Sequence, residues 1–319
     1  ILTFSTAVLL GAVPVLAQTA VSLSQPDGKF PEPFTSVSAI RELPSGKLLV
    51  ADRQDKVVQM IDFASGTMTK VGREGQGPGE YALPMGLIAM PNGATWINDI
   101  LGRRFLVVDA NGKPGSTVQL PGSTGGGISI GGLGAGSDGR GGYYFQASPF
   151  NPASPSGESP DSLAILRWDG KLAMDTVAWV VPPKSSISTS GSSGNRRVSM
   201  TIGGSKVFTP AEAWGVADDG SIARVVPSPY RVLWYGPKAA TPVAGPIQAY
   251  TPMKVTEEDK KEVIEQRKKS RPMFITMGPG GRQANSGNIQ MPDPEFEDTK
   301  PPFTSQGAVA VSPDGEVWV

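Results

Sequence analysis

Short apolar runs separated by turns that contain glycine recur along the chain and predict β-hairpins. Each hairpin consists of an apolar strand, a turn with a glycine and a second strand, as expected where a turn requires a positive φ. The pattern occurs at residues 38–52, 85–99, 131–145, 213–226 and 307–319. The turn glycines that it predicts are Gly46, Gly93, Gly139, Gly220 and Gly315.

The first two hairpins define a repeat of about 45 residues, which is the size of a four-stranded propeller blade. Gly46 and Gly93 lie 47 residues apart, and Asp52 and Asp99 each follow their glycine by six residues. The register therefore continues past the hairpin. Two further strands are predicted in each unit, over 57–62 and 67–72 in the first and over 105–112 and 116–120 in the second.

Insertions interrupt this pattern in the later units. Residues 148–162 and 184–197 are rich in Ser, Gly and Pro, which is typical of flexible surface loops. One surface helix is predicted near 256–270, because Thr256 is a suitable N-cap, acidic residues precede basic ones, and Glu–Lys pairs are spaced i, i+4. Residues 273–298 mix apolar residues with turn formers, which favours a variable surface loop over a lid.

The glycine-rich stretch VGREGQGPGEY, residues 71–81, does not match a phosphate-binding loop. Its glycines have neither the Walker nor the dinucleotide spacing, and no lysine follows. A phosphate loop leads into a helix, whereas Pro84 and the apolar run 87–90 predict a strand here. We therefore interpret the stretch as a tight connection between strands.

Composition narrows the chemistry of the 319-residue chain. The chain contains 40 glycines and 30 prolines, a composition that favours short strands and turns over long helices. Lys plus Arg and Asp plus Glu are 29 each, so no net field attracts nucleic acid, and none is expected as a partner. The absence of Cys and His excludes disulfides, thiolate nucleophiles, Ser-His-Asp triads and nearly every zinc site.

Residues 1–17 resemble a secretory signal peptide whose start is missing. The run is apolar and ends in Val15-Leu16-Ala17, which has small residues at the positions a signal peptidase requires, so cleavage is expected before Gln18. A buried N-terminal helix or strand is the alternative. We expect a secreted or periplasmic protein in which residues 18–319 form a single propeller domain, with no membrane span.

Two segments carry a resemblance to a known family. The stretch PEPFTSVSAIRELPSGKLLVAD, residues 31–52, followed by residues 71–81 and Leu-Pro, resembles the six-bladed, NHL-type β-propellers of exported bacterial proteins. In that family a G-R-x-G-x-G-P-G-E-[FY] loop leads from the outer strand of one blade to the inner strand of the next. The resemblance is strong over 31–120 and weaker to 319. The loop residues that it implies as inter-blade structural are Gly72, Gly75, Gly77, Gly79, Glu80 and Tyr81.

The resemblance implies an all-β fold of six blades, each with four antiparallel strands. At this repeat length the chain would contain about four and a half blades, a C-terminally incomplete ring. Because an incomplete ring exposes an apolar blade face, such a chain is expected to be poorly stable alone.

Charged residues near the repeated strands are candidates for recognising an anionic or polar ligand at one end of the propeller channel. The alternative is inter-blade ion pairing and solvated loops. The favoured function is non-catalytic binding or scaffolding by a monomer without cofactor, with an unidentified protein, peptide or glycan as partner. The candidate ligand-binding residues are Arg73, Glu74, Arg103, Arg104, Arg224 and Arg231.

The alternative function is a calcium-dependent hydrolase of the lactonase or esterase type, which some propellers of this form are. The zinc-dependent lyases and quinone-dependent dehydrogenases among such propellers rely on His, which this chain lacks. A calcium site requires oxygen ligands. The weak candidates are Asp52, Asn98, Asp99 and Asp109, whose repeated positions favour capping of turns and strand ends instead.

Overall fold

The computed structural model describes residues 25–26, 28–119, 136–147, 157–158, 160–171, 174–182, 186–192, 195–203, 206–239, 241–269, 273–278, 281–286, 293–304, 309–312 and 315–319. The chain divides into two units, Ile1–Pro33 and Phe34–Val319. The described residues of the first unit form neither helix nor strand, and the segment interpreted as a signal peptide lies outside the described residues.

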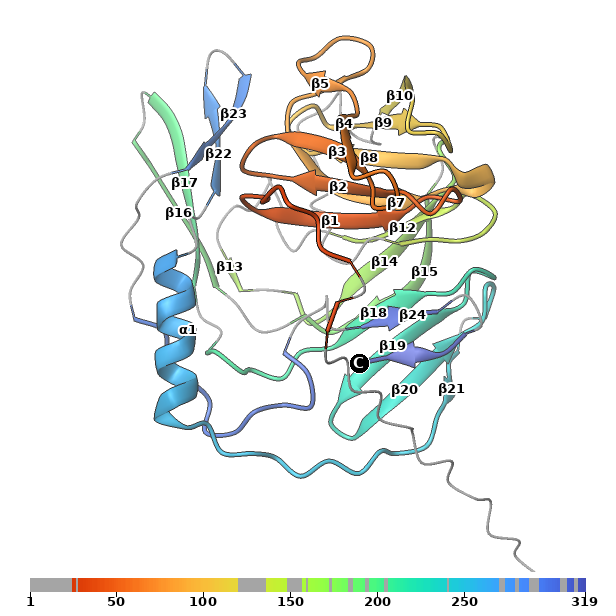
Figure 1. Ribbon diagram of the computed structural model, residues 1–319. Helices are drawn as coiled ribbons and strands as arrows, with labels where there is room; N and C mark the ends of the chain where they lie inside the picture. Colours follow the sequence, from red (N-terminus) through yellow and green to blue (C-terminus); the bar gives the residue numbers. More distant parts are fainter. Residues whose placement is uncertain are drawn as a thin grey trace, which may run out of the picture. The chain divides into compact units, whose positions relative to one another are not determined.

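In the described part of the second unit, four antiparallel sheets of four strands follow one another along the chain (Figure 1). Within each sheet the strands pair in chain order, and the first strand of each sheet lies against the first strand of the next. This is a β-propeller arrangement with four blades, followed by a hairpin. Blade 1 contains β1 (Val37–Glu42), β2 (Leu48–Asp52), β3 (Val57–Asp62) and β4 (Thr67–Lys70), and blade 2 contains β7 (Pro84–Ala89), β8 (Thr95–Asp99), β9 (Arg104–Val108) and β10 (Pro114–Gln119). Blade 3 contains β11 (Gly136–Ser137), β12 (Tyr143–Gln146), β14 (Leu163–Trp168) and β15 (Met174–Val180), and blade 4 contains β18 (Ala213–Val216), β19 (Ile222–Pro227), β20 (Tyr230–Tyr235) and β21 (Val243–Ala244). The hairpin contains β24 (Ala310–Val311) and β25 (Val317–Trp318).

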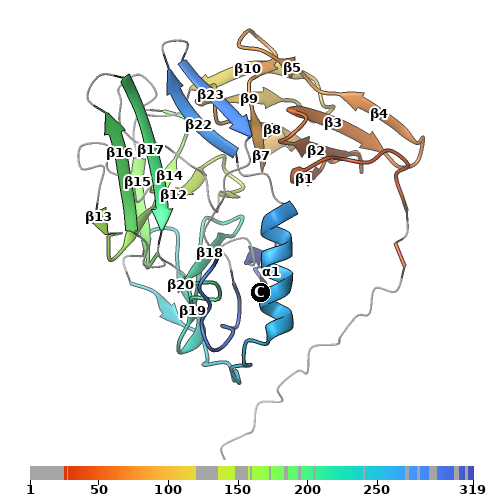
Figure 2. The ribbon, with the colours of Figure 1, turned by 90° about the vertical axis from the view of Figure 1, so that its left-hand side faces the viewer.

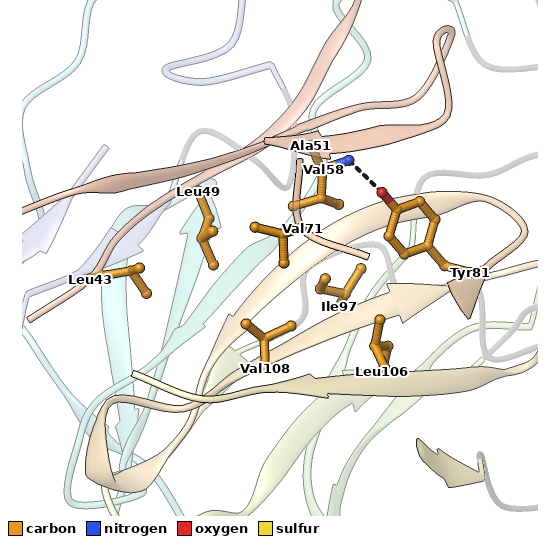
Figure 3. Close-up of a cluster of buried hydrophobic side chains, with 9 residues drawn as sticks. All are labelled: Leu43, Leu49, Ala51, Val58, Val71, Tyr81, Ile97, Leu106 and Val108. Atoms are coloured by element: carbon orange, nitrogen blue, oxygen red, sulfur yellow. Dashed lines mark hydrogen bonds between the residues drawn. The ribbon is translucent and has the colours of Figure 1, made fainter. Parts of the chain in front are cut away.

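The core consists of apolar layers between successive blades. Side chains alternate along a strand, so a strand in a blade with a neighbour on each side is apolar on both faces. Figure 3 shows the layer between blades 1 and 2, where Leu49 and Val58 meet Ile97 and Leu106. Similar layers join blade 2 to blade 3, blade 3 to blade 4, and blade 4 to the hairpin. Every described blade is thus stabilised mainly by burial against its neighbours.

One predicted turn glycine is wrong. Gly46, Gly93, Gly220 and Gly315 have the expected positive φ, but in blade 3 the corresponding residue is Gly141, with φ 87°, and not Gly139. In that turn the Asp138 N–H donates to the Gly142 carbonyl, which shifts the register by two residues. The run of closely spaced glycines offered several positions for the turn, and strand pairing selected one of them.

The insertions contain more regular structure than their composition predicts. The Ser-rich segments form a sheet of β13 (Gly157–Glu158), β16 (Ser186–Ser192) and β17 (Asn195–Gly203), so the flexible-loop interpretation of these parts is wrong. A hairpin of β22 (Met273–Gly278) and β23 (Gly281–Ser286) lies with β22 beside β17 (Figure 2). Ser and Thr are compatible with strands when a partner strand is present, and composition alone does not reveal the partner.

The predicted helix is present as α1 (Glu257–Lys269). Thr256 and Asp259 cap it reciprocally: the Thr256 N–H and hydroxyl donate to Asp259 Oδ2, and the Asp259 N–H donates to Thr256 Oγ1. Lys300 Nζ lies 2.7 Å from Asp259 Oδ1 and fixes the start of the helix to the returning chain. No helix in the described part of the chain is long and apolar enough to cross a membrane.

Candidate binding face

The links between strands fall at two different ends of the blades. Because neighbouring strands are antiparallel, the links from strand one to two and from three to four lie at one end. The links from strand two to three, and from one blade to the next, lie at the other. The three insertions, which follow β12, β15 and β21, all leave from this second end, which we call the loop-bearing end. The opposite end has short turns.

Asp52 stands where the second strand of blade 1 reaches the loop-bearing end. Its Oδ2 accepts the backbone N–H groups of Thr35 at 2.7 Å and Ser36 at 2.9 Å, just before β1. Its Oδ1 accepts those of Gln54 and Asp55 in the following loop. Burial raises the pKa of Asp52, but these four donors outweigh burial and hold the pKa below its usual value. The carboxylate therefore joins the start of blade 1 to the loop between β2 and β3.

Asp99 repeats this arrangement in blade 2. Its Oδ1 accepts the N–H groups of Leu83, before β7, at 2.9 Å and of Gly102, in the loop, at 3.0 Å. Its Oδ2 lies 3.2 Å from Nε of Arg104, and the side chain is 0% exposed. The two aspartates thus act as equivalent supports of neighbouring blades.

Arg104 connects this support to the glycine-rich loop. Its Nη1 donates to the carbonyl of Gln76 at 2.7 Å, and its Nη2 donates to those of Glu80 at 2.9 Å and Gly75 at 3.3 Å. Since Nε is bound to Asp99, all three nitrogens of the guanidinium have partners inside the protein. Arg104 therefore clamps the inter-blade loop onto blade 2.

The glycine-rich loop is built around the carboxylate of Glu80. The short parallel pair of β5 (Arg73–Glu74) and β6 (Glu80–Tyr81) forms its base, and the Gly77 N–H donates to Glu80 Oε2 at 2.7 Å. A Cβ at Gly75 would overlap this carboxylate, and one at Gly77 would lie 3.0 Å from it. The Gly77 N–H, and then Arg73, hold the pKa of Glu80 below its usual value.

Two other residues of the loop fix its position between the blades. A Cβ at Gly72, where φ is 72°, would lie 2.8 Å from the carbonyl oxygen of Gly79. The Tyr81 ring is 0% exposed in the layer between blades 1 and 2, and its hydroxyl accepts the Val58 N–H at 2.9 Å (Figure 3). Burial raises the pKa of Tyr81, so its hydroxyl stays protonated.

The remaining loop candidates of blades 1 and 2 differ in exposure. The Arg73 side chain is 80% exposed, with Nε 2.7 Å from Glu80 Oε1. The Glu74 side chain is 61% exposed and lies 2.9 Å from Lys56 Nζ. Arg103, next to Arg104 in the chain, is half-buried and adopts a φ of 53°. These residues share the loop-bearing end.

The candidates in blade 4 lie in a separate group. Arg224 binds Glu212 through Nη2 at 2.5 Å and Nε at 2.7 Å, and its Nη1 donates to the Tyr235 hydroxyl. Burial lowers the pKa of Arg224, but Glu212 outweighs it and the pKa is raised. The Nε of Arg231 is buried and has no hydrogen-bond partner among the described residues. Arg224 thus forms an internal ion pair with Glu212.

Sequence reasoning missed the acidic partners. Glu212 also accepts the Val181 N–H and so joins blades 3 and 4. Asp138, at the opposite end, binds Arg167 Nε and the Tyr144 hydroxyl, each at 3.0 Å. An arginine in an otherwise apolar strand requires a buried carboxylate, and this signal was available for both arginines.

The weak metal candidates do not fit a calcium site. The carboxylates of Asp52 and Asp99 are bound by the protein's own donors. Asp109 lies at the opposite end of β9 from Asp99, and it accepts the backbone N–H groups of Asn111 and Lys113. The Asn98 Oδ1 is buried, and no partner for it occurs in the part of the chain that the structure describes. Among the described residues no group of three or more acidic side chains is placed to hold a metal ion.

Comparisons with known proteins return distant structural similarities. No family model and no curated protein sequence matches the chain. A streptogramin B lyase structure is similar at 12% identity and a TM-score of 0.36, covering 90% of this chain and 91% of that one. Virginiamycin B lyase from Staphylococcus aureus is similar at 11% identity and 0.37, covering 82% and 88%. A gluconolactonase from Xanthomonas campestris is similar at 12% identity and 0.35, covering 69% and 78%. At such values nothing about this chain's activity follows from them.

Proposed function

We propose that the protein is a non-catalytic binding or scaffold propeller that acts outside the cytoplasm and recognises a protein, peptide or glycan through its loop-bearing end. The observation that carries this proposal is the placement of the insertions, all of which emerge at that end. Loops on a rigid scaffold are the usual carriers of recognition. The signal-like residues 1–17 support export, and the repeat and the loop motif support a six-bladed propeller of the NHL type, which we expect to be monomeric.

The charges at this end support binding over catalysis. Carboxylates that act as general bases or metal ligands need open oxygen atoms. Those of Asp52 and Asp99 are bound by backbone donors or by Arg104, and Arg104 and Arg224 are bound internally. These residues therefore serve the scaffold, and the exposed loops around them form the surface for a partner.

Site-specific cross-linking tests which end binds. A photoreactive residue is placed either at Gln76, exposed at the loop-bearing end, or at Ser65, exposed at the opposite end. We expect discrete cross-linked products outside the cytoplasm from position 76 and none from position 65. The same products from both positions, or products from position 65 alone, would contradict the proposed face.

The alternative hydrolase is tested with the purified protein. A panel of lactones and simple esters is assayed with calcium and with a chelator, and thermal unfolding is followed in parallel. We expect no turnover and an unchanged unfolding temperature. Calcium-dependent turnover together with a raised unfolding temperature would replace the binding proposal by the lactonase alternative.

A further inference from the structure

We infer that Arg73 is a preorganised anchor that binds a carboxylate of an acidic peptide partner. The inference rests on the proposed binding function and names the partner's chemistry. It starts from an unusual combination, because the Arg73 side chain is 80% exposed although it pairs with a carboxylate, that of Glu80, which is only 16% exposed.

The hydrogen bonding of Arg73 leaves one edge of its guanidinium open. Its Nε donates to Glu80 Oε1 at 2.7 Å, and no other hydrogen bond of this guanidinium occurs within the described residues. The two terminal amino groups form the edge that matches a carboxylate in a bidentate pair. Arg104 provides the contrast, since all its nitrogens are bound internally and its side chain is 10% exposed. Arg104, which holds the loop from blade 2, thus has a buried side chain and no open edge, whereas Arg73 keeps one.

The loop supports the guanidinium from beneath. Glu80 is held by the Gly77 N–H at 2.7 Å, and Gly75 must lack a Cβ for the carboxylate to occupy its place. The carboxylate in turn fixes Nε of Arg73. An exposed arginine normally loses considerable side-chain entropy when it binds, and part of that cost has already been met here. A rigid first contact held by a second set of residues is typical of a recognition group.

The charges around Arg73 are close to balanced, so no broad field attracts anions and recognition depends on the open edge of Arg73. Lys56 lies 2.9 Å from Glu74 and Arg73 pairs with Glu80, while Asp55 and Arg53 are both exposed in the adjacent loop of blade 1. The open edge presents two N–H groups in one plane, an arrangement that binds the two oxygens of a carboxylate.

The same loops favour a peptide over a glycan. Glycan recognition commonly relies on exposed aromatic rings for stacking against sugar faces. Among the described loops 53–56, 71–83 and 100–103 the aromatic content is Tyr81 alone, which is 0% exposed. Charge-assisted hydrogen bonding to acidic side chains is the chemistry that remains.

The experiment measures binding of a fluorescent hexaglutamate peptide to the full chain by anisotropy at about 50 mM salt, where exposed charges are weakly screened. The variants are Arg73→Gln, which removes the donor pair, and Arg73→Lys, which keeps the charge but not the planar fork. Arg53→Gln is the matched control, because Arg53 is an exposed arginine at the same end whose Nε binds only the Ser36 hydroxyl. Unfolding in urea checks that each variant is folded.

We expect Arg73→Gln to weaken hexaglutamate binding about tenfold, the effect of one charge-assisted hydrogen bond, and Arg73→Lys to weaken it nearly as much. Arg53→Gln should change it less than about twofold. Equal losses for Arg73→Gln and Arg53→Gln would show unspecific attraction and overturn the inference. So would full binding by Arg73→Lys, no binding by the unchanged protein, or preferred binding of phosphate or a uronate oligosaccharide. Because the cross-linking and turnover assays do not depend on Arg73, such a failure leaves the proposed binding function intact.

Discussion

Replacing Arg104 with methionine is expected to destabilise the protein by about 3–5 kcal/mol, the cost of removing one partner from a buried ion pair. Methionine retains much of the side-chain length, so the change mainly removes the charge and its donors. It leaves the loop carbonyls of Gly75, Gln76 and Glu80 without their common donor. The variant therefore loses both the contact between blade 2 and the inter-blade loop and the partner of the buried Asp99 carboxylate.

The magnitude follows from the surroundings of Asp99. Its side chain is 0% exposed, and the N–H groups of Leu83 and Gly102 bind only Oδ1. Without Arg104, Oδ2 is a buried charge with no partner. Replacing Asp99 by asparagine as well should recover about 1–3 kcal/mol, the usual coupling of neighbouring charged groups.

The free energy of unfolding is measured by urea titration, with far-ultraviolet circular dichroism and tryptophan fluorescence as separate probes. Arg53→Met is the control, because it removes an exposed charge at the same end and should cost less than about 1 kcal/mol. A loss of 1 kcal/mol or less for Arg104→Met, or additivity of the Asp99 and Arg104 substitutions, would refute the clamp.

Three further predictions concern acid, glycine and the helix. The folded-state pKa values of Asp52 and Glu80 are lowered. The stabilisation that these two carboxylates provide is therefore present above their unfolded-state pKa values of about 4 and is lost as the pH falls through their folded-state pKa values. The free energy of unfolding, measured by urea titration, should be level between pH 7 and 5 and fall below about pH 4. Gly75→Ala should cost at least about 2 kcal/mol because its Cβ overlaps a carboxylate, whereas Gly46→Ala, which has open space, should cost about 1 kcal/mol of backbone strain; equal costs in urea titrations would contradict the overlap. Replacing residues 256–270 by a Gly-Ser linker should change stability by no more than about 1 kcal/mol, and loss of soluble folded protein would show that the polar helix packs on the blades.

The regular part of the propeller was predictable from local sequence. A hairpin needs a residue that tolerates a positive φ at one turn position and, on either side of it, strands whose side chains alternate between two faces. Both requirements depend only on residues that are close in sequence. Blades 1 and 2 and the helix α1 could therefore be located from the sequence, within a few residues of their observed ends. Gly141 shows the limit of local reasoning, because several glycines could serve the turn and only pairing with the next strand selected one.

The candidate site depended on contacts that no local pattern encodes. The motif around Glu80 was visible in the sequence, but its shape depends on Arg104, which lies in the next blade. Arg104 and Arg224 are bound by groups inside the protein, whereas Arg73 remains exposed. The difference depends on which carboxylates and carbonyls the fold places beside each arginine. The sequence by itself determined the repeat, the turns and the excluded chemistries, because these depend on neighbouring residues or on residue types that are absent. Only the tertiary structure decided which end bears the insertions and which charges stay open, because both follow from how distant strands pair.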